Sequence, residues 1–287
     1  MKPPPSEPLS RNCYRHSLMM ADWVWLAAGL LGGGAAAGLL AGLLGVGGGV
    51  VMVPILFQLM LALDVAAAVQ MHVAVGTSLA IIVVTGSRAA QAQIRRRALD
   101  WAAWRMLAWP MALGTALGAW AVRYVSADGL KLIFALALCL VAAKLLLAPD
   151  WGTAARQPLA RTAQRALAAI TGFLSAWLGI GGGIFSVLLL RAAGHAIHRA
   201  VATSSGLGVV IALAGAAGFV WSGWGAAGLP RYALGYVYLP GLAMALASLV
   251  TAPLGVRLSH AFQPRQLELV FAGFLLLAAA RMLAALA

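Results

Sequence analysis

Charged residues are scarce in this sequence: they make up 9% of the 287 residues, against about 25% in an average soluble domain. Hydrophobic residues make up 63%. A soluble protein of this length would need far more polar surface, so the composition excludes one. A lipid bilayer is the solvent that fits. Because a spanning helix needs about 20 apolar residues, we expect about eight to ten membrane segments.

Acidic residues are the scarcest charged type, with 7 Asp and Glu against 20 Lys and Arg. They lie in the N-terminal stretch or near the ends of apolar runs. A cation transporter usually buries a carboxylate within the membrane, so this placement favours an anionic or neutral substrate. The same placement leaves no pair of carboxylates for a hydrolase mechanism. No serine has the sequence context of an acyl-transfer nucleophile. We therefore expect no enzyme activity.

Several classes of ligand are excluded in the same way. The two cysteines, Cys13 and Cys139, give no disulfide framework, and no cluster of His, Cys, Asp or Glu has metal-ligand spacing. We expect neither a metal nor another cofactor. The net charge of +13 does not indicate nucleic acid as a partner, because no nucleic-acid-reading motif accompanies it.

The basic residues indicate instead which loops face the cytoplasm. Most of them lie in alternate loops, at about residues 95–105, 144–165, 191–199 and 257–265. The intervening loops hold Arg123, Lys131 and Arg231. Cytoplasmic loops are enriched in Lys and Arg, so we assign the first set to the cytoplasm. The side of the N-terminal tail stays open, because that tail also carries basic residues.

Three sequence blocks return in the same order in the second half of the chain. They are Gly45–Val50 and Gly179–Ile184, His72–Ser78 and His198–Ser204, and Leu130–Phe134 and Leu267–Phe271. We therefore predict a flexible tail at 1–22, a first membrane repeat at 23–148, a cytoplasmic linker at 149–165 and a second membrane repeat at 166–287. The charge pattern places equivalent loops on opposite sides of the membrane, which predicts inverted topology.

Each glycine block is expected to break a membrane helix, because consecutive glycines weaken one. The apolar segments that follow, at 50–63 and 184–194, are too short to cross a hydrocarbon core about 30 Å thick. A new helix start presents free N–H groups and a positive dipole end, which favour an anion. We predict that the substrate binds near the midplane, at Gly47, Gly48, Gly49, Gly181, Gly182 and Gly183. The alternative is close helix packing, which small residues promote.

Hydroxyl side chains follow each glycine block. Thr77 and Ser78, and their equivalents Thr203 and Ser204, can donate hydrogen bonds to an anion without adding fixed charge. Alternatively, they bond to backbone carbonyls one turn back, as in many membrane helices. The sequence favours neither interpretation over the other.

His72 and His198 are also matched between the halves. Histidine titrates near neutral pH, so both are candidates for coupling transport to protons. Their positions at the ends of predicted segments favour the simpler interpretation, in which both side chains lie at the membrane interface.

These motifs together resemble the TauE/SafE family of sulfite exporters. The resemblance rests on Gly42–Gly49 with Val53-Pro54, on Ala74–Ser78, on Gly172–Ser175 with Gly179–Gly183, on Ala200–Ser204 and on Pro253-Leu254-Gly255. It implies duplicated halves, a multi-pass protein of the bacterial inner membrane, and transport of sulfur-containing anions such as sulfite or organosulfonates. The chain departs from the family pattern at Arg97-Ala98, where relatives often have Gly-Asn, and at Ala202, where the first repeat has Gly76.

We therefore predict an all-α polytopic integral membrane protein with two inverted repeats and glycine-broken short helices. A small sulfur-containing anion would bind between the halves, and rocking of the halves would expose the site to each side in turn. Transport of another small organic anion is the first alternative. A membrane enzyme acting on lipids and a membrane assembly protein are others. The lipid bilayer is the expected surrounding, and the sequence leaves homo-oligomer formation open.

Overall fold

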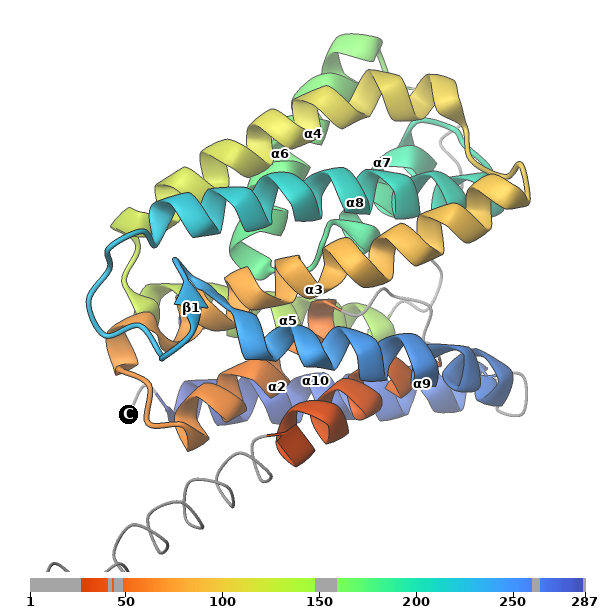
Figure 1. The fold of residues 1–287 in the computed structure, drawn as a ribbon. Coiled ribbons are helices and arrows are strands. Elements are labelled where there is room, and N and C mark those ends of the chain that lie inside the picture. Colours follow the sequence, from red (N-terminus) through yellow and green to blue (C-terminus); the bar gives the residue numbers. More distant parts are fainter. Residues whose placement is uncertain (1–26, 41–42, 44–48, 148–158, 260–263, 286–287) are drawn as a thin grey trace, which may run out of the picture.

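The computed structural model describes residues 27–40, 43, 49–147, 159–259 and 264–285. The first half contains a helix over Ala27–Leu40, α2 (Gly49–Ala62), α3 (Ala67–Arg95), α4 (Trp101–Ala121) with the short 3-10 helix η1 (Val122–Tyr124), and α5 (Ala127–Leu147). The second half contains α6 (Arg161–Leu178), α7 (Gly183–Ala192), α8 (Ile197–Ser222), η2 (Leu239–Leu242), α9 (Ala243–Ser259) and α10 (Pro264–Ala284) (Figure 1). The all-α prediction is confirmed.

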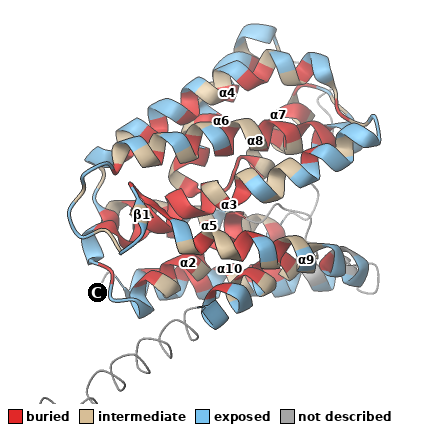
Figure 2. Cartoon of the chain, in the orientation of Figure 1, coloured by how far each residue is buried: buried red, intermediate tan, exposed pale blue. Residues whose placement is uncertain are grey.

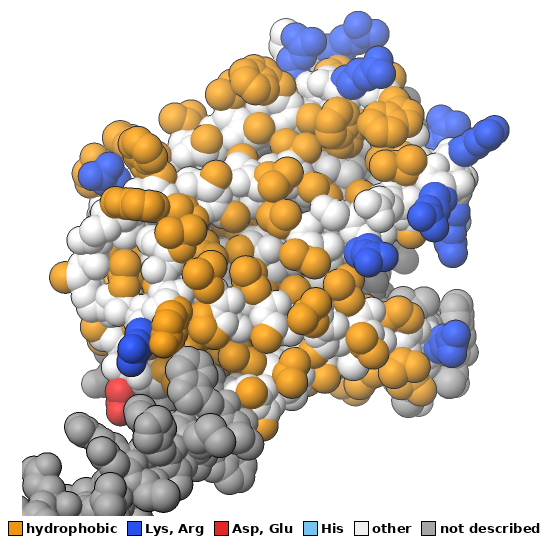
Figure 3. Space-filling model, viewed as in Figure 1, with side chains coloured by type: hydrophobic (Ala, Val, Ile, Leu, Met, Phe, Trp, Pro, Cys, Tyr) orange, Lys and Arg blue, Asp and Glu red, His pale blue; other side chains and the backbone are white. Residues whose placement is uncertain are grey.

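The helices carry the apolar composition of membrane segments. α3, α5 and α8 are each long and apolar enough to cross a bilayer. Large apolar side chains also cover the outer surface: Trp109 is 70% exposed, Leu140 72% and Val250 71% (Figures 2 and 3). Such a surface is unfavourable in water, and it matches the hydrocarbon of a bilayer. The membrane assignment therefore rests on the fold as well as on composition.

The two helices that follow the glycine blocks are short, as predicted. α2 has 14 residues and α7 has 10, so neither reaches across a hydrocarbon core at about 1.5 Å per residue. α3 and α8, the long helices that come next, pack side by side. α8 begins near the end of α3 and ends near its start, so the two helices run in opposite directions (Figure 1). This is the direction that inverted repeats require, although the inversion of the whole halves stays a prediction.

Two hydrophobic cores hold the molecule together, and they do not follow the two halves of the sequence. The smaller core lies between α4, α6, α7 and α8, around Leu107, Met111, Leu190 and Ile211. The larger core joins α2, α3, α5 and α10 to the helix at Ala27–Leu40 and the start of α9. It also reaches the ends of α4, α6 and α8. Thus α4 of the first half packs with the second half, and α9 packs with the first.

Glycines allow these exchanged helices to approach closely. A Cβ atom on Gly114 of α4 would overlap the carbonyl oxygen of Ala169 on α6. On the other pair, a Cβ on Gly34 would lie 2.6 Å from the Cα of Met244 on α9. Both contacts are backbone against backbone, the geometry that small residues permit between membrane helices.

The apolar run at residues 233–256 is not one continuous helix. Ala233–Leu234 (β1) and Val237–Tyr238 (β2) form an antiparallel pair, and α9 starts only at Ala243. Gly235 has a φ of +55°, a left-handed conformation that glycine adopts without strain. The N–H of Tyr236 donates to the carbonyl of Phe219, 3.2 Å away, which docks this hairpin on the end of α8.

Basic side chains gather at one end of the molecule, where α3 ends and α4 begins (Figure 3). The opposite end, where α3 starts, shows far fewer of them in the same view. By the positive-inside rule we expect the basic end to face the cytoplasm. We use "cytoplasmic end" and "outer end" for these two ends below.

Candidate functional site

The structure brings the two glycine blocks into contact. A Cβ atom on Gly49, at the start of α2, would lie 2.7 Å from the carbonyl oxygen of Gly179 and 2.6 Å from the Cα of Ile180. Only glycine permits this approach. Gly47 and Gly48 of the first block lie outside the described residues. The start of α2 therefore abuts the break between α6 and α7.

That break is built from left-handed glycines. Gly179, Gly181 and Gly182 have φ values of +60°, +66° and +71°, which other residues adopt only at a cost. They end α6 at Leu178 and start α7 at Gly183. The N–H of Ser186 donates to the carbonyl of Gly182 at 2.8 Å, which closes the first turn of α7. The N–H groups of that turn precede any intrahelical partner and carry the positive end of the helix dipole.

The predicted hydroxyls have backbone partners. Ser78 donates to the carbonyl of Gly179 at 2.9 Å, so it belongs to the glycine site. Ser204 donates to the carbonyl of Val201 at 2.9 Å, within its own helix. The alternative interpretation, bonding to a carbonyl one turn back, thus describes Ser204 but not Ser78.

Each of the two threonines accepts a hydrogen bond from the backbone of a segment far away in the sequence. Thr203 accepts a hydrogen bond from the N–H of Asp100 at 3.0 Å, and Thr77 accepts one from the N–H of Tyr238 at 2.9 Å. The first bond ties α8 to the segment before α4, and the second ties α3 to the segment before α9. Both threonines keep a hydroxyl proton to donate, and their role in substrate binding stays a prediction.

Two serines that the sequence prediction missed lie beside the glycine break. Ser175 and Ser186 are both fully buried, and the hydroxyl of Ser175 has no hydrogen-bond partner in the described part of the chain. A Cβ on Gly182 would lie 3.3 Å from each of the two hydroxyl oxygens. The signal was present in the sequence, because Ser175 belongs to the Gly172–Ser175 motif and Ser186 follows Gly183 by three positions.

Comparison with known proteins decides the family. The family model of the sulfite exporter TauE/SafE matches residues 30–282. The chain belongs to this family. A probable membrane transporter protein of Haemophilus influenzae is 34% identical over 250 residues, which cover 87% of this chain and 95% of the relative. The chain is therefore a membrane transporter.

Two further relatives have the same kind of name. The probable membrane transporter protein YunE of Bacillus subtilis is 28% identical over 172 residues, or 54% of this chain and 63% of the relative. A probable membrane transporter protein of Methanocaldococcus jannaschii is 32% identical over 107 residues, or 37% of this chain and 39% of the relative. No solved structure matches the chain.

The two matched histidines of this TauE/SafE protein lie in different surroundings. His198 is exposed, whereas the side chain of His72 is buried inside the protein, with 4% exposed. A position of either histidine at the membrane interface stays a prediction. Its Nε2 atom lies 3.1 Å from the carbonyl of Val125 and 3.3 Å from that of Val122. The hairpin residue Tyr236 covers the ring at a centroid distance of 4.9 Å. Proton coupling through either histidine stays a prediction.

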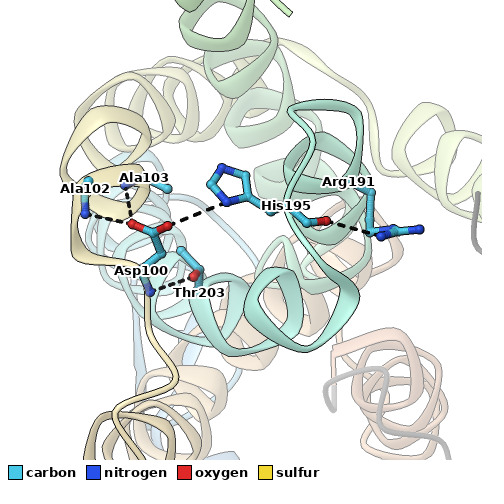
Figure 4. A network of polar contacts seen from close by, with 6 residues as sticks. All are labelled: Asp100, Ala102, Ala103, Arg191, His195 and Thr203. Atoms are coloured by element: carbon cyan, nitrogen blue, oxygen red, sulfur yellow. Dashed lines mark hydrogen bonds and ion pairs between the residues drawn. The ribbon is translucent and has the colours of Figure 1, made fainter. Parts of the chain in front are cut away.

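A polar network lies at the cytoplasmic end of this TauE/SafE protein, where α4 begins (Figure 4). Asp100 caps α4: one carboxylate oxygen accepts from the N–H groups of Ala102 and Ala103 at 3.0 and 3.1 Å. The other oxygen lies 3.6 Å from Nδ1 of His195, in the loop before α8. Arg191 donates to the carbonyl of His195 at 3.2 Å, which holds that loop. Together with Thr203, these contacts join α4 to α8.

We predict that Asp100→Ala lowers the free energy of unfolding by about 1 kcal/mol, mainly through loss of the helix cap. Asp100→Asn keeps a capping side chain and loses only the contact with His195, which is partly exposed and worth less than about 1 kcal/mol. Thermal unfolding of the purified protein in detergent measures both variants. An Asn variant as unstable as the Ala variant would contradict the assignment to the cap.

A pocket of about 510 Å³ opens at the outer end of the TauE/SafE fold. It is lined by residues 63–66 and 228–232 and by Tyr238. The N–H of Tyr238 donates to Thr77, so the pocket borders strand β2, which is hydrogen-bonded to α3. Within the described residues, no group of three or more His, Cys, Asp and Glu could hold a metal ion.

Proposed function

We propose that this transporter carries a small sulfur-containing anion, such as sulfite or an organosulfonate, across the bacterial inner membrane, without a catalytic step. The observation that carries the proposal is the buried start of α7, where left-handed glycines leave backbone N–H groups beside two hydroxyls. This environment favours negative charge. Among the described residues, Asp and Glu are missing from the buried polar side chains, so no carboxylate opposes an anion there.

The proposed site lies where the two bodies of the molecule meet. Gly49 and Ser78 contact the glycine break beside Ile180 and Ile184, which belong to the larger core. Ser186, one turn into α7, contacts Met111 of the smaller core. We propose that the bodies defined by these cores move against each other. Because α4 and α9 each pack with the other half of the sequence, the bodies that move in this proposal are not the two sequence halves. In this proposal the pocket at the outer end gives access from one side, and the Asp100 network closes the other.

Flux into proteoliposomes tests the proposal. We expect saturable uptake of at least one of sulfite, sulfate, thiosulfate, taurine and a simple organosulfonate, with protein-free liposomes as the control. Repeating the measurement with and without a pH gradient tests proton coupling. Uptake of an unrelated organic anion, with none of the five carried by folded protein, would contradict the sulfur-anion proposal and keep the transporter assignment.

A further inference from the structure

Two buried hydroxyls face the same backbone turn at the start of α7. Ser175 lies in the last turn of α6 and Ser186 in the first turn of α7, and both have an exposed fraction of 0%. Each hydroxyl oxygen would lie 3.3 Å from a Cβ placed on Gly182. Both hydroxyls therefore lie next to the helix start.

Neither hydroxyl has a good hydrogen-bond acceptor in the part of the chain that the structure describes. Among the described residues the Ser175 oxygen has no partner, and the Ser186 oxygen lies 3.9 Å from the sulfur of Met111, a weak acceptor. Buried hydroxyls in native proteins are normally paired, because an unpaired one has lost its water without compensation. A ligand that accepts hydrogen bonds at this position would supply the missing partner to both.

The equivalent positions in the first half lack hydroxyls. The repeat aligns Ser175 with Ala41 and Ser186 with Met52. Met52 is buried and apolar, and Ala41 lies outside the described residues. Since hydroxyls stand at these two positions in the second repeat and not in the first, the two blocks are not equivalent as anion sites.

We propose that Ser175 and Ser186 donate hydrogen bonds to the oxygens of an oxyanion held at the start of α7. The ligand class is a sulfur oxyanion, either free, as in sulfite, or as the sulfonate group of an organic compound. The hydroxyls and N–H groups add no fixed charge, and the surrounding Ile211 and Met111 strengthen their electrostatic attraction by excluding water. This inference rests on the proposed function and assigns its binding residues to one half.

The test uses Ser175→Ala, Ser186→Ala and the double variant in the full-length protein. A hydrogen bond to a charged group contributes enough that each loss raises the KM for flux by about tenfold or more. Ser205→Ala is the matched control, because its hydroxyl donates to the carbonyl of Ala202 in α8 at 2.7 Å. That control should keep the KM of the unmodified protein.

Thermal unfolding separates a binding role from a structural one. Because Ser175 bonds to no group among the described residues, Ser175→Ala should leave the Tm without substrate unchanged. The rise in Tm that added sulfite gives the unmodified protein should be lost. A double variant with unchanged KM and an unchanged sulfite-induced rise would overturn this inference while leaving the proposed function intact. Absence of both flux and a Tm rise in the unmodified protein, with all five anions, would instead overturn the proposed function.

Discussion

Replacing Gly182 with alanine is expected to abolish transport while the protein still inserts into the membrane and folds. Gly182 has a φ of +71°, where an alanine costs about 1–2 kcal/mol. Its Cβ would also overlap the Cδ1 atom of Ile211 on α8 and crowd both serine hydroxyls. The methyl group thus occupies the place where the anion oxygens are proposed to bind. Flux in proteoliposomes measures the loss, which we expect to exceed a hundredfold, about 3 kcal/mol.

The control for Gly182→Ala is a glycine with the same backbone conformation and free surroundings. Gly225, in the loop after α8, has a φ of +77° and no atom within 4 Å of a Cβ position. Gly225→Ala carries the conformational cost and leaves the glycine break untouched, so we expect normal flux from it. If both variants lost flux equally, backbone strain would explain the result, and the assignment of Gly182 to the site would fail.

The second large effect concerns folding. Gly114→Ala is expected to prevent α4 from packing on α6, because the added Cβ overlaps the carbonyl oxygen of Ala169. A backbone carbonyl in a helix cannot rotate aside, so the helices must separate. The contact of Gly118 with Phe173 and the 2.9 Å hydrogen bond from the Trp177 indole to the Gly118 carbonyl depend on the same approach. Overpacking of this kind costs about 1–3 kcal/mol or more.

Size-exclusion profiles and thermal unfolding in detergent measure this effect. Gly273→Ala in α10 is the control, because it is exposed and no atom lies within 4 Å of its Cβ position. Alanine has a higher helix propensity than glycine by about 1 kcal/mol. We therefore expect Gly273→Ala to unfold at the same or a higher temperature and Gly114→Ala to aggregate or unfold early. A Gly114→Ala protein as stable as the control would refute the close α4–α6 contact.

The short helices could be predicted from the sequence because their cause is local. Three consecutive glycines permit left-handed backbone, and the short apolar segments that follow fix the lengths of α2 and α7. The helix exchange could not be predicted in this way. The glycine at 114 indicates a close approach of helices, but nothing along the chain identifies Ala169 as the residue it approaches. The same holds for Thr77 and Thr203, whose backbone donors lie 161 and 103 positions away.

The histidines show why equal motifs need not have equal environments. His72 and His198 stand in matching blocks, yet the hairpin after α8 covers His72 through Tyr236. The segment between α3 and α4, which occupies the equivalent place for His198, has no such hairpin. In the sequence, Gly235 and Pro240 indicate a turn within the run at 233–256. The high hydrophobicity of that run favours a helix instead, so the hairpin could not be predicted.

The exchange of helices also bears on how the chain is made. During synthesis α4 enters the membrane before α6 is made. Until then, the face of α4 that carries Gly114 is in contact with lipid. The helix at Ala27–Leu40 is without its partner for longer, because Gly34 and Gly38 pack on Met244 and Ser248 of α9. A chain whose translation stops before α9 would lack the partner of Gly34 and Gly38, so their small-residue face would stay in contact with lipid. The native assembly of this transporter is thus completed near the end of translation, after most of its segments are already in the bilayer.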